Sequence, residues 1–313
     1  MPDVPRLGYG AANVGNLYRS LTDEAATAVL DAAWESGIRY FDTAPHYGLG
    51  LSERRLGAFL AAKPREEYFI STKVGRLLRP VPNPSGLLDE ANDFAVPADF
   101  ERVFDLSADG VRRSLDESLE RLGLDRVDAL YLHDPERASL DAAERSAYPA
   151  LIELRDAGLV DHVGVGSMSV EALERAAAFA GLDLLMVAGR LTLAEQPALD
   201  RAVPRALANG MKIVAAGVFN SGMLATSTPG GRYEYGSAPE ELLARVGAIA
   251  EVCTAFGVEL PAAALQYTLR IPPVVSVVVG GSRPEQVAEN ARRLAADIPE
   301  AFWNALTEAG LIP

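Results

Sequence analysis

The chain has 313 residues, 49% of them hydrophobic and 23% charged, which excludes a disordered chain and leaves enough apolar side chain for a large core. Its 29 basic residues against 43 acidic ones give a formal net charge of −14. We therefore expect neither nucleic acid nor a membrane surface as a partner, because both repel negative charge.

Short β-rich apolar runs alternate with longer runs of helical periodicity, which is typical of repeated βαβ units. In chain order, we predict strands at 6–10, 38–42, 68–73, 127–133, 162–166, 183–188, 212–216 and 274–280. Helices are predicted at 22–36, 52–62, 107–122, 143–157, 169–180, 197–208, 239–256 with 261–270, and 284–294. This regular alternation indicates an α/β fold with one domain over 1–313, a (β/α)8 TIM barrel. A doubly wound open sheet is the alternative, which the lack of G-x-G-x-x-G after the first strand disfavours.

Residues at the ends of the predicted helices support these bounds. Hydroxyl side chains that can accept hydrogen bonds from the first helical amides precede four runs, at Thr22, Ser52, Ser107 and Ser169. Glycines stand where four helices are expected to stop, at Gly37, Gly123, Gly158 and Gly181. The single cysteine, Cys253, lies in an apolar helical pattern without His or Cys at metal-ligand spacing, so we predict a core residue and no metal site.

Two connections are unusually long. Residues 74–106 follow the third predicted strand, and residues 217–238, which include Pro229-Gly230-Gly231, follow the seventh. Loops of this length without structure of their own are uncommon in compact domains and are often functional. Because loops after barrel strands lie at the face where active sites are built, we predict that both form walls of a substrate pocket.

Four polar residues stand at or just beyond the C-terminal ends of predicted strands. Asp42 and Tyr47 follow the second strand, Lys73 ends the third and His133 ends the fourth. One such residue is commonly only a surface boundary, but adjacent barrel strands would bring all four together. The ammonium of Lys73 would lower the pKa of Tyr47 from about 10, with Asp42 holding Lys73 in position. His133 would orient a substrate oxygen or help to pass its proton, so the group predicts a proton-transfer site.

Short motifs surround these four residues: 42–48 (Asp-Thr-Ala-Pro-His-Tyr-Gly), Ser52-Glu53, Ser71-Thr72-Lys73 and Tyr131-Leu132-His133. Together they resemble the motifs of the aldo-keto reductase family, and the resemblance covers nearly the whole chain. It implies an oxidoreductase that moves hydride between a nicotinamide cofactor and a small-molecule sugar or aldehyde. On this resemblance Tyr47 is the catalytic acid and base, Lys73 and Asp42 tune it, and His133 positions the carbonyl or hydroxyl.

A glycine-rich turn follows the last predicted strand and leads into the last predicted helix. Glycines let backbone amides approach a phosphate at a helix N-terminus, although such turns are often purely structural. The turn also resembles the cofactor segment of the family, which implies binding by Gly280, Gly281, Ser282, Arg283, Gln286 and Asn290. Within this set, we expect Arg283 to contact the adenosine end of the cofactor and Asn290 its adenine.

Two departures from the family pattern bear on the cofactor. The usual Ser-Asn pair after the fifth strand is here Gly166-Ser167, so we assign the carboxamide contact to Ser167. Gln286 and Gly280 stand where NADP-preferring relatives often have Arg and Lys, whereas Arg283 remains available to a phosphate. We therefore favour NAD over NADP.

Segments 188–193 and 219–224 resemble a subgroup of the family that contains D-threo-aldose 1-dehydrogenase, L-fucose dehydrogenase and pyridoxal 4-dehydrogenase. This likeness implies oxidation of a sugar hemiacetal or alcohol, as in an aldose 1-dehydrogenase. A general NADPH-dependent reductase of aldehydes and ketones and a nicotinamide-binding regulatory subunit are the alternatives. The chain shows neither a leader pattern nor a run of about 18 apolar residues, so we expect a cytoplasmic protein, either a monomer or a weak homo-oligomer.

Overall fold

A computed structural model describes residues 4–84, 86–226, 232–233 and 236–313. Parallel strands close into a barrel in the order β1-β14-β11-β10-β9-β8-β3-β2, so the open-sheet alternative is wrong and the barrel prediction is confirmed. The strands are β1 (Leu7–Gly10), β2 (Tyr40–Asp42), β3 (Phe69–Val74), β8 (Val127–His133), β9 (Val160–Ser167), β10 (Leu184–Ala188), β11 (Lys212–Ala216) and β14 (Val274–Val279). Every end lies within two residues of its prediction.

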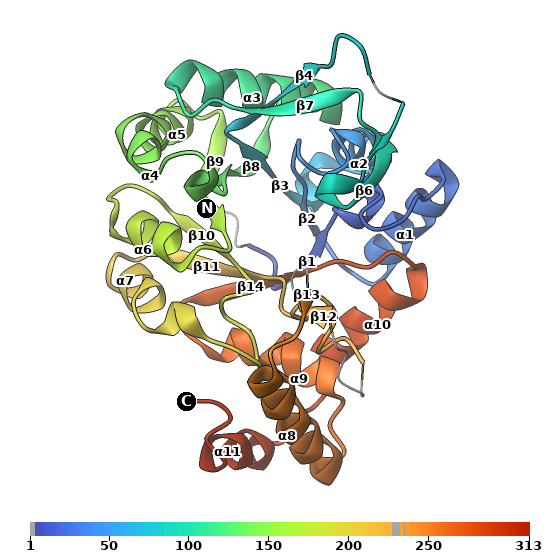
Figure 1. The fold of residues 1–313 in the computed structure, drawn as a ribbon, viewed down its shortest axis with the longest axis vertical. Helices are drawn as coiled ribbons and strands as arrows, with labels where there is room; N and C mark the ends of the chain where they lie inside the picture. The colour runs from blue at the N-terminus through green and yellow to red at the C-terminus, as the bar shows by residue number, and fades with distance from the viewer. Residues whose placement is uncertain (1–3, 85, 227–231, 234–235) are drawn as a thin grey trace.

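Helices surround the barrel (Figure 1). They are α1 (Asp23–Glu35), α2 (Leu51–Leu60), α3 (Ala108–Leu122), α4 (Leu140–Ala142), α5 (Tyr148–Asp156), α6 (Val170–Ala178), α7 (Ala202–Ala208), α8 (Glu240–Phe256), α9 (Leu260–Tyr267), α10 (Pro284–Leu294) and α11 (Glu300–Glu308). The helix predicted at 143–157 begins as a π-helical turn over Ala143–Ala147. The helix predicted at 197–208 is a 3-10 turn at Pro197–Leu199 followed by α7.

The two faces of the barrel strands have different environments because successive side chains of a strand point to opposite sides. One set packs among the strands themselves and includes Tyr40, Phe69, Tyr131, Met186 and Val278. The alternate residues of the same strands pack in a larger cluster together with apolar side chains of the surrounding helices. The near-continuous apolar runs of the sequence therefore follow from burial on both faces.

The C-terminal helices form a separate apolar cluster. Residues from α8, α9 and α11 pack there, and they include Cys253, which is a core residue as predicted, and Trp303. The sequence analysis did not predict α11, whose buried residues are Phe302, Trp303 and Leu306. Among the described residues no single helix is long and apolar enough to cross a membrane, and one pair that passes by length and composition, 240–256 with 260–270, is bent by 107°.

Three of the four predicted helix caps are confirmed. The hydroxyls of Thr22, Ser107 and Ser169 accept hydrogen bonds from amides of the first turns of α1, α3 and α6. The prediction for Ser52 is wrong, because α2 begins one residue earlier, after Gly50. Ser52 is fully buried, and its hydroxyl donates to the carbonyl of Ala11 at 2.8 Å and lies 2.8 Å from the hydroxyl of Thr43.

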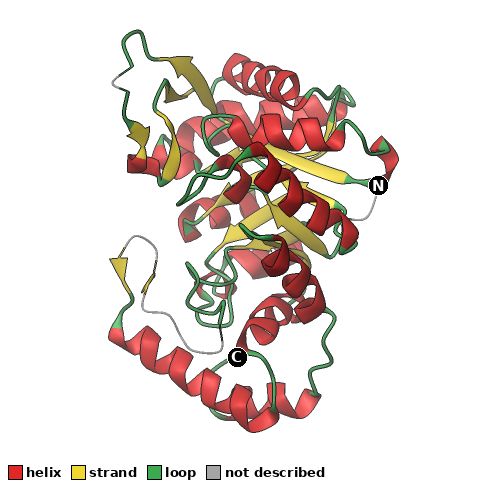
Figure 2. Ribbon diagram, turned by 90° about the vertical axis from the view of Figure 1, so that its right-hand side faces the viewer, coloured by secondary structure: helices red, strands yellow, loops and turns green. Residues whose placement is uncertain are grey.

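The long connection after β3 has secondary structure of its own. β4 (Arg76–Pro80) pairs antiparallel with β7 (Phe100–Phe104), and the short strands β5 (Leu88–Asp89) and β6 (Phe94–Pro97) pair with each other. This hairpin structure stands at one end of the barrel (Figure 2). In the connection after β11, β12 (Arg232–Tyr233) pairs with β13 (Gly236–Ser237), whereas Pro229-Gly230-Gly231 lies outside the described residues.

Candidate active site

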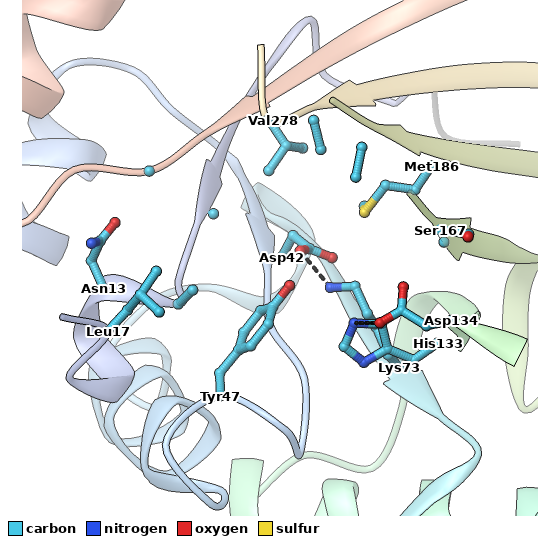
Figure 3. Close-up of a pocket in the computed structure, with 17 residues that line it drawn as sticks. Asn13, Leu17, Asp42, Tyr47, Lys73, His133, Asp134, Ser167, Met186 and Val278 are labelled. Carbon is cyan, nitrogen blue, oxygen red and sulfur yellow. Dashed lines mark hydrogen bonds and ion pairs between the residues drawn. The ribbon is translucent and has the colours of Figure 1, made fainter. Parts of the chain in front are cut away.

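The four candidate catalytic residues line one cavity, although they come from three strands and a loop (Figure 3). Asp42 ends β2, Lys73 is the penultimate residue of β3, His133 ends β8, and Tyr47 follows β2 by five residues. Strand pairing sets this arrangement, because Asp42 lies opposite Ser71 and Lys73 lies opposite Tyr131. The cavity has a volume of about 230 Å³ and opens at the carboxyl ends of the strands.

Asp42 holds Lys73 in a buried ion pair. The ammonium of Lys73, 2% exposed, donates to Asp42 Oδ2 at 2.6 Å and to the carbonyl of Thr43 at 2.9 Å. The other carboxylate oxygen of Asp42 accepts from Ser71 Oγ at 2.7 Å. The pair is therefore fixed on both sides, as a buried pair requires if its hydrogen bonds are to offset desolvation.

Lys73 and Tyr47 are close enough to affect each other's protonation. Lys73 Nζ lies 4.7 Å from the centre of the Tyr47 ring. Burial raises the pKa of Tyr47, while the charge of Lys73 lowers it, and the net pKa lies above its ordinary value. The predicted influence of Lys73 is thus present, but the expected net lowering is wrong because burial of the phenol outweighs it. Burial acts to lower the pKa of Lys73, but the charges of Asp42 and Tyr47 raise it above its ordinary value.

His133 faces Tyr47 across the cavity. Their rings are perpendicular, with centres 6.0 Å apart. Burial lowers the pKa of His133 well below its ordinary value, and the charges of Arg76 and Lys73 lower it further. The imidazole is therefore neutral near pH 7 and can exchange hydrogen bonds with a substrate oxygen without adding a charge.

The segment that carries Tyr47 is supported from behind by the hairpin after β3. Phe94 packs against Tyr47 with ring centres 6.3 Å apart and the rings tilted, and Arg102 donates to the carbonyl of His46 at 2.9 Å. Burial followed by the charges of nearby arginines lowers the pKa of His46 to about 2. None of the described residues of this connection, 74–106, lines the cavity itself. The prediction that it forms a wall of the pocket is therefore wrong, and it instead supports the segment that carries Tyr47.

Close backbone contact fixes the position of Tyr47. Gly48 has φ +61°, and a Cβ there would lie 2.1 Å from the carbonyl oxygen of Gly15. We predict that Gly48→Ala destabilises the fold by about 1–3 kcal/mol and lowers kcat/KM, because the backbone next to Tyr47 must move. Gly123→Ala is the matched control, since Gly123 also has a positive φ, +64°, but has open space around it. Equal losses in urea unfolding for the two variants would contradict this prediction.

Ser167 lines the same cavity, and its hydroxyl already takes part in two hydrogen bonds. Its hydroxyl donates to Glu136 Oε1 at 2.8 Å and accepts from the amide of Ser169 at 2.8 Å. Because the single hydroxyl proton is used by Glu136, Ser167 can only accept a further hydrogen bond from a ligand. The sequence analysis missed Glu136, which lies three residues after His133 in a turn without a local motif.

A groove of about 440 Å³ continues from the cavity along the end of β14, and the two share Asn13, Leu17, Gly217, Val278 and Gly280. Among the predicted cofactor residues, the groove is lined by Gly280, Gly281, Ser282, Gln286 and Asn290. Arg283 is exposed at the start of α10 and lines neither hollow. The structure therefore brings these predicted cofactor residues together in one groove, except for Arg283.

The groove also contains residues that the sequence analysis did not single out. Arg293 lines it, and its guanidinium pairs with Glu259 and Glu289, at 3.0 Å in each case. Ser221 and Gly222 contribute from the connection after β11, so this loop forms a wall of the groove, and its first residue, Gly217, also lines the cavity. The i, i+3 spacing of Asn290 and Arg293 on α10 was a signal that could have identified Arg293.

Comparisons with known proteins identify the family of the chain. The model of the aldo/keto reductase family matches residues 6–310. The chain is 59% identical to D-threo-aldose 1-dehydrogenase from Pseudomonas sp, over 99% of this chain and 95% of the relative. It is 40% identical to pyridoxal 4-dehydrogenase from Microbacterium luteolum, over 99% and 95% of the two chains.

A solved structure shows the same fold. The aldo-keto reductase from Bacillus halodurans, in its holo form, superposes with a TM-score of 0.78 at 22% identity, covering 98% of this chain and 92% of that one. Both the family match and the two relatives extend over nearly all of the sequence. The chain therefore belongs to the aldo/keto reductase family and is an NAD(P)-dependent oxidoreductase that acts on a small molecule.

Proposed function

We propose that this enzyme oxidises the C1 hydroxyl of aldoses and that NAD⁺ is its preferred hydride acceptor. The observation that carries the proposal is the convergence of Tyr47, Lys73 and His133 on one cavity, with Asp42 buried behind Lys73. The 59% identity to an enzyme named D-threo-aldose 1-dehydrogenase supports the substrate class and the direction.

The glycine-rich turn along the groove has no room for side chains at two positions. A Cβ at Gly280 would lie 2.5 Å from Asn13 Oδ1, and one at Gly281 would lie 2.9 Å from Val287 Cγ2. The amides of this turn lead into the N-terminus of α10, which favours a phosphate. Gly280, Gly281, Ser282, Gln286 and Asn290 would hold the cofactor along the groove, and Ser167 would accept a hydrogen bond from its carboxamide. When bound, the nicotinamide accepts or donates the hydride.

The residues of this chain then move one proton. In oxidation, Tyr47 without its proton takes the proton of the C1 hydroxyl, and the ammonium of Lys73 partly offsets the effect of burial that disfavours this phenolate. Neutral His133 hydrogen-bonds the same oxygen and fixes its position between the two rings. In reduction, the same Tyr47 oxygen returns the proton to the carbonyl oxygen.

A substrate panel tests the proposal. We expect the purified enzyme to oxidise some of L-fucose, L-galactose and D-arabinose with NAD⁺ at higher kcat/KM than it reduces simple aldehydes with NADPH. Pyridoxal belongs in the panel because of the second relative. A reversed ranking would favour a general aldehyde reductase, and cofactor binding without turnover of any compound would favour a regulatory subunit.

The charge distribution of the groove supports NAD. Arg293 is held by two carboxylates, from Glu259 and Glu289. Gln286 uses its side-chain oxygen to accept from the amide of Ser282 at 3.0 Å. A 2′-phosphate would therefore meet few uncommitted donors, whereas a free 2′-hydroxyl needs none that are charged.

One substitution is expected to change this preference. We predict that Gln286→Arg lowers the Kd of NADP⁺ about 5- to 10-fold relative to that of NAD⁺, because it adds a guanidinium beside the groove. Fluorescence titration of each dinucleotide measures the ratio. Glu285→Arg, one residue earlier on the exposed side of α10, is the control for the general effect of positive charge. An equal change in both variants would show that Gln286 does not face the ribose.

A further inference from the structure

Asp134 has an unusual backbone conformation at the edge of the cavity. It follows His133 directly and lies in the left-handed region, with φ +44° and ψ +58°. Side chains other than Asn and Asp rarely adopt this conformation. Its amide donates to the carbonyl of Gly166 at 2.9 Å, so the residue is fixed where the chain leaves the barrel. The resulting turn places Asp134 in the lining of the cavity, together with Tyr47 and His133.

An arginine from the hairpin holds the Asp134 carboxylate. Arg76, on β4 and 4% exposed, donates a hydrogen bond to Asp134 Oδ2. The same oxygen lies 3.7 Å from His133 Nε2. Oδ1 has no hydrogen-bond partner in the part of the chain that the structure describes. Figure 3 shows the carboxylate beside the His133 ring with one oxygen turned away from it.

The spacing of these two groups matches two oxygens on neighbouring carbons. A reacting oxygen hydrogen-bonded to His133 lies about 2.8 Å from Nε2, and a second hydroxyl would lie about as far from the carboxylate. In a gauche vicinal pair, the two oxygens are about 3 Å apart. The 3.7 Å between Nε2 and Oδ2 therefore places the Asp134 carboxylate within reach of a second hydroxyl, and Oδ1 is the oxygen left to accept its hydrogen bond.

We propose that Asp134 determines specificity by accepting a hydrogen bond from the hydroxyl next to the reacting carbon. The site would then select aldoses and α-hydroxy aldehydes over compounds without that hydroxyl. The inference rests on the proposed function for the place of the reacting oxygen, between Tyr47 and His133.

The surroundings of Asp134 make this contact selective. Leu17, Met186, Ala188 and Ala216 supply apolar lining to the cavity, and the hydroxyl proton of Ser167 is used by Glu136. A carboxylate accepts hydrogen bonds and donates none, so it fits a hydroxyl and not an ether or a methyl group. A substrate that lacks the hydroxyl leaves Oδ1 of the carboxylate desolvated and without a hydrogen bond, which weakens binding of that substrate in the transition state.

Two substrate pairs that differ by one hydroxyl test the proposal. In oxidation, D-arabinose is compared with 2-deoxy-D-ribose, and in reduction, lactaldehyde is compared with propanal. We expect wild-type kcat/KM to be roughly 10- to 100-fold higher for the hydroxylated member of each pair, the loss typical of one hydrogen bond to a charged group. A ratio near one in the wild type would overturn the proposal.

Substitution at Asp134 separates specificity from structure. In Asp134→Ala, the ratio of kcat/KM between the hydroxylated and the deoxygenated substrate should fall to near one, because only the hydroxylated substrates lose rate. Asp134→Asn keeps an acceptor of the same size, so its ratio should lie between those of the wild type and the alanine variant. Equal loss for both members of a pair would assign Asp134 a purely structural role. If the alanine variant does not fold, the wild-type ratio and the asparagine variant still decide.

Arg79→Gln controls for the loss of an ion pair on the hairpin, because Arg79 lies on the same strand as Arg76 and pairs with Glu117 at 2.9 Å, away from the cavity. It should leave both ratios unchanged. The reductive pair keeps the two proposals distinguishable. A preference for lactaldehyde without any sugar oxidation would contradict the aldose proposal and support the role of Asp134. Sugar oxidation without preference in either pair would support the aldose proposal and contradict the role of Asp134.

Discussion

Tyr47→Phe is expected to lower kcat about 10²- to 10⁴-fold while cofactor affinity stays within about twofold, because positioned acid–base catalysis typically contributes that much. The substitution removes one oxygen and leaves the ring that packs against Phe94. The dinucleotide groove is lined by residues of other segments and is not altered. Steady-state kinetics with the best sugar of the panel and fluorescence titration of NAD⁺ measure the two quantities.

The control for this experiment is Tyr148→Phe. Tyr148 is a fully buried phenol on α5 that does not line the cavity. It therefore reports what the loss of a buried hydroxyl does to the protein in general. Near-normal turnover of Tyr47→Phe, or a similar loss in both variants, would refute the proton-transfer role of Tyr47.

Lys73→Met is expected to have the second large effect, on rate and on stability together. Loss of the ammonium removes the charge that lowers the pKa of Tyr47, so less phenolate is present at any pH below that pKa. Oxidation needs Tyr47 without its proton, so the rising limb of the pH–kcat/KM profile should move to higher pH. The rate at pH 7 should fall about 10²- to 10⁴-fold and recover in part as pH rises.

The same substitution leaves the carboxylate of Asp42 buried without its cation. Removing one partner of a buried pair typically destabilises a fold by about 3–5 kcal/mol. Ser71 still donates to Asp42, which favours the lower end of that range. Urea unfolding of Lys73→Met measures the loss, and Lys63→Met, a lysine over the Trp34 ring outside the cavity, is the control. An unshifted pH profile would show that Lys73 does not tune Tyr47.

The prediction from sequence was most accurate where local pattern decides structure. Short β-rich apolar runs predicted the ends of the strands, and hydroxyl caps predicted the starts of three helices, because both signals lie within one segment. Asp42, Lys73 and His133 could be found as polar residues that end apolar strands. Tyr47 lies outside any strand, and its place depended on the family motif around it.

The sequence by itself thus determined the order of the elements, the closed barrel and the identity of the residues at the strand ends. Only the tertiary structure decided how buried those residues are and what they contact. It showed that burial outweighs Lys73 in the pKa of Tyr47, that the Ser52 hydroxyl contacts Ala11 and Thr43 instead of capping a helix, and that Arg283 does not line the groove. It also placed the Asp134 carboxylate between Arg76 and His133. These outcomes depend on solvent exclusion and on partners distant in sequence, which no local pattern of side chains encodes.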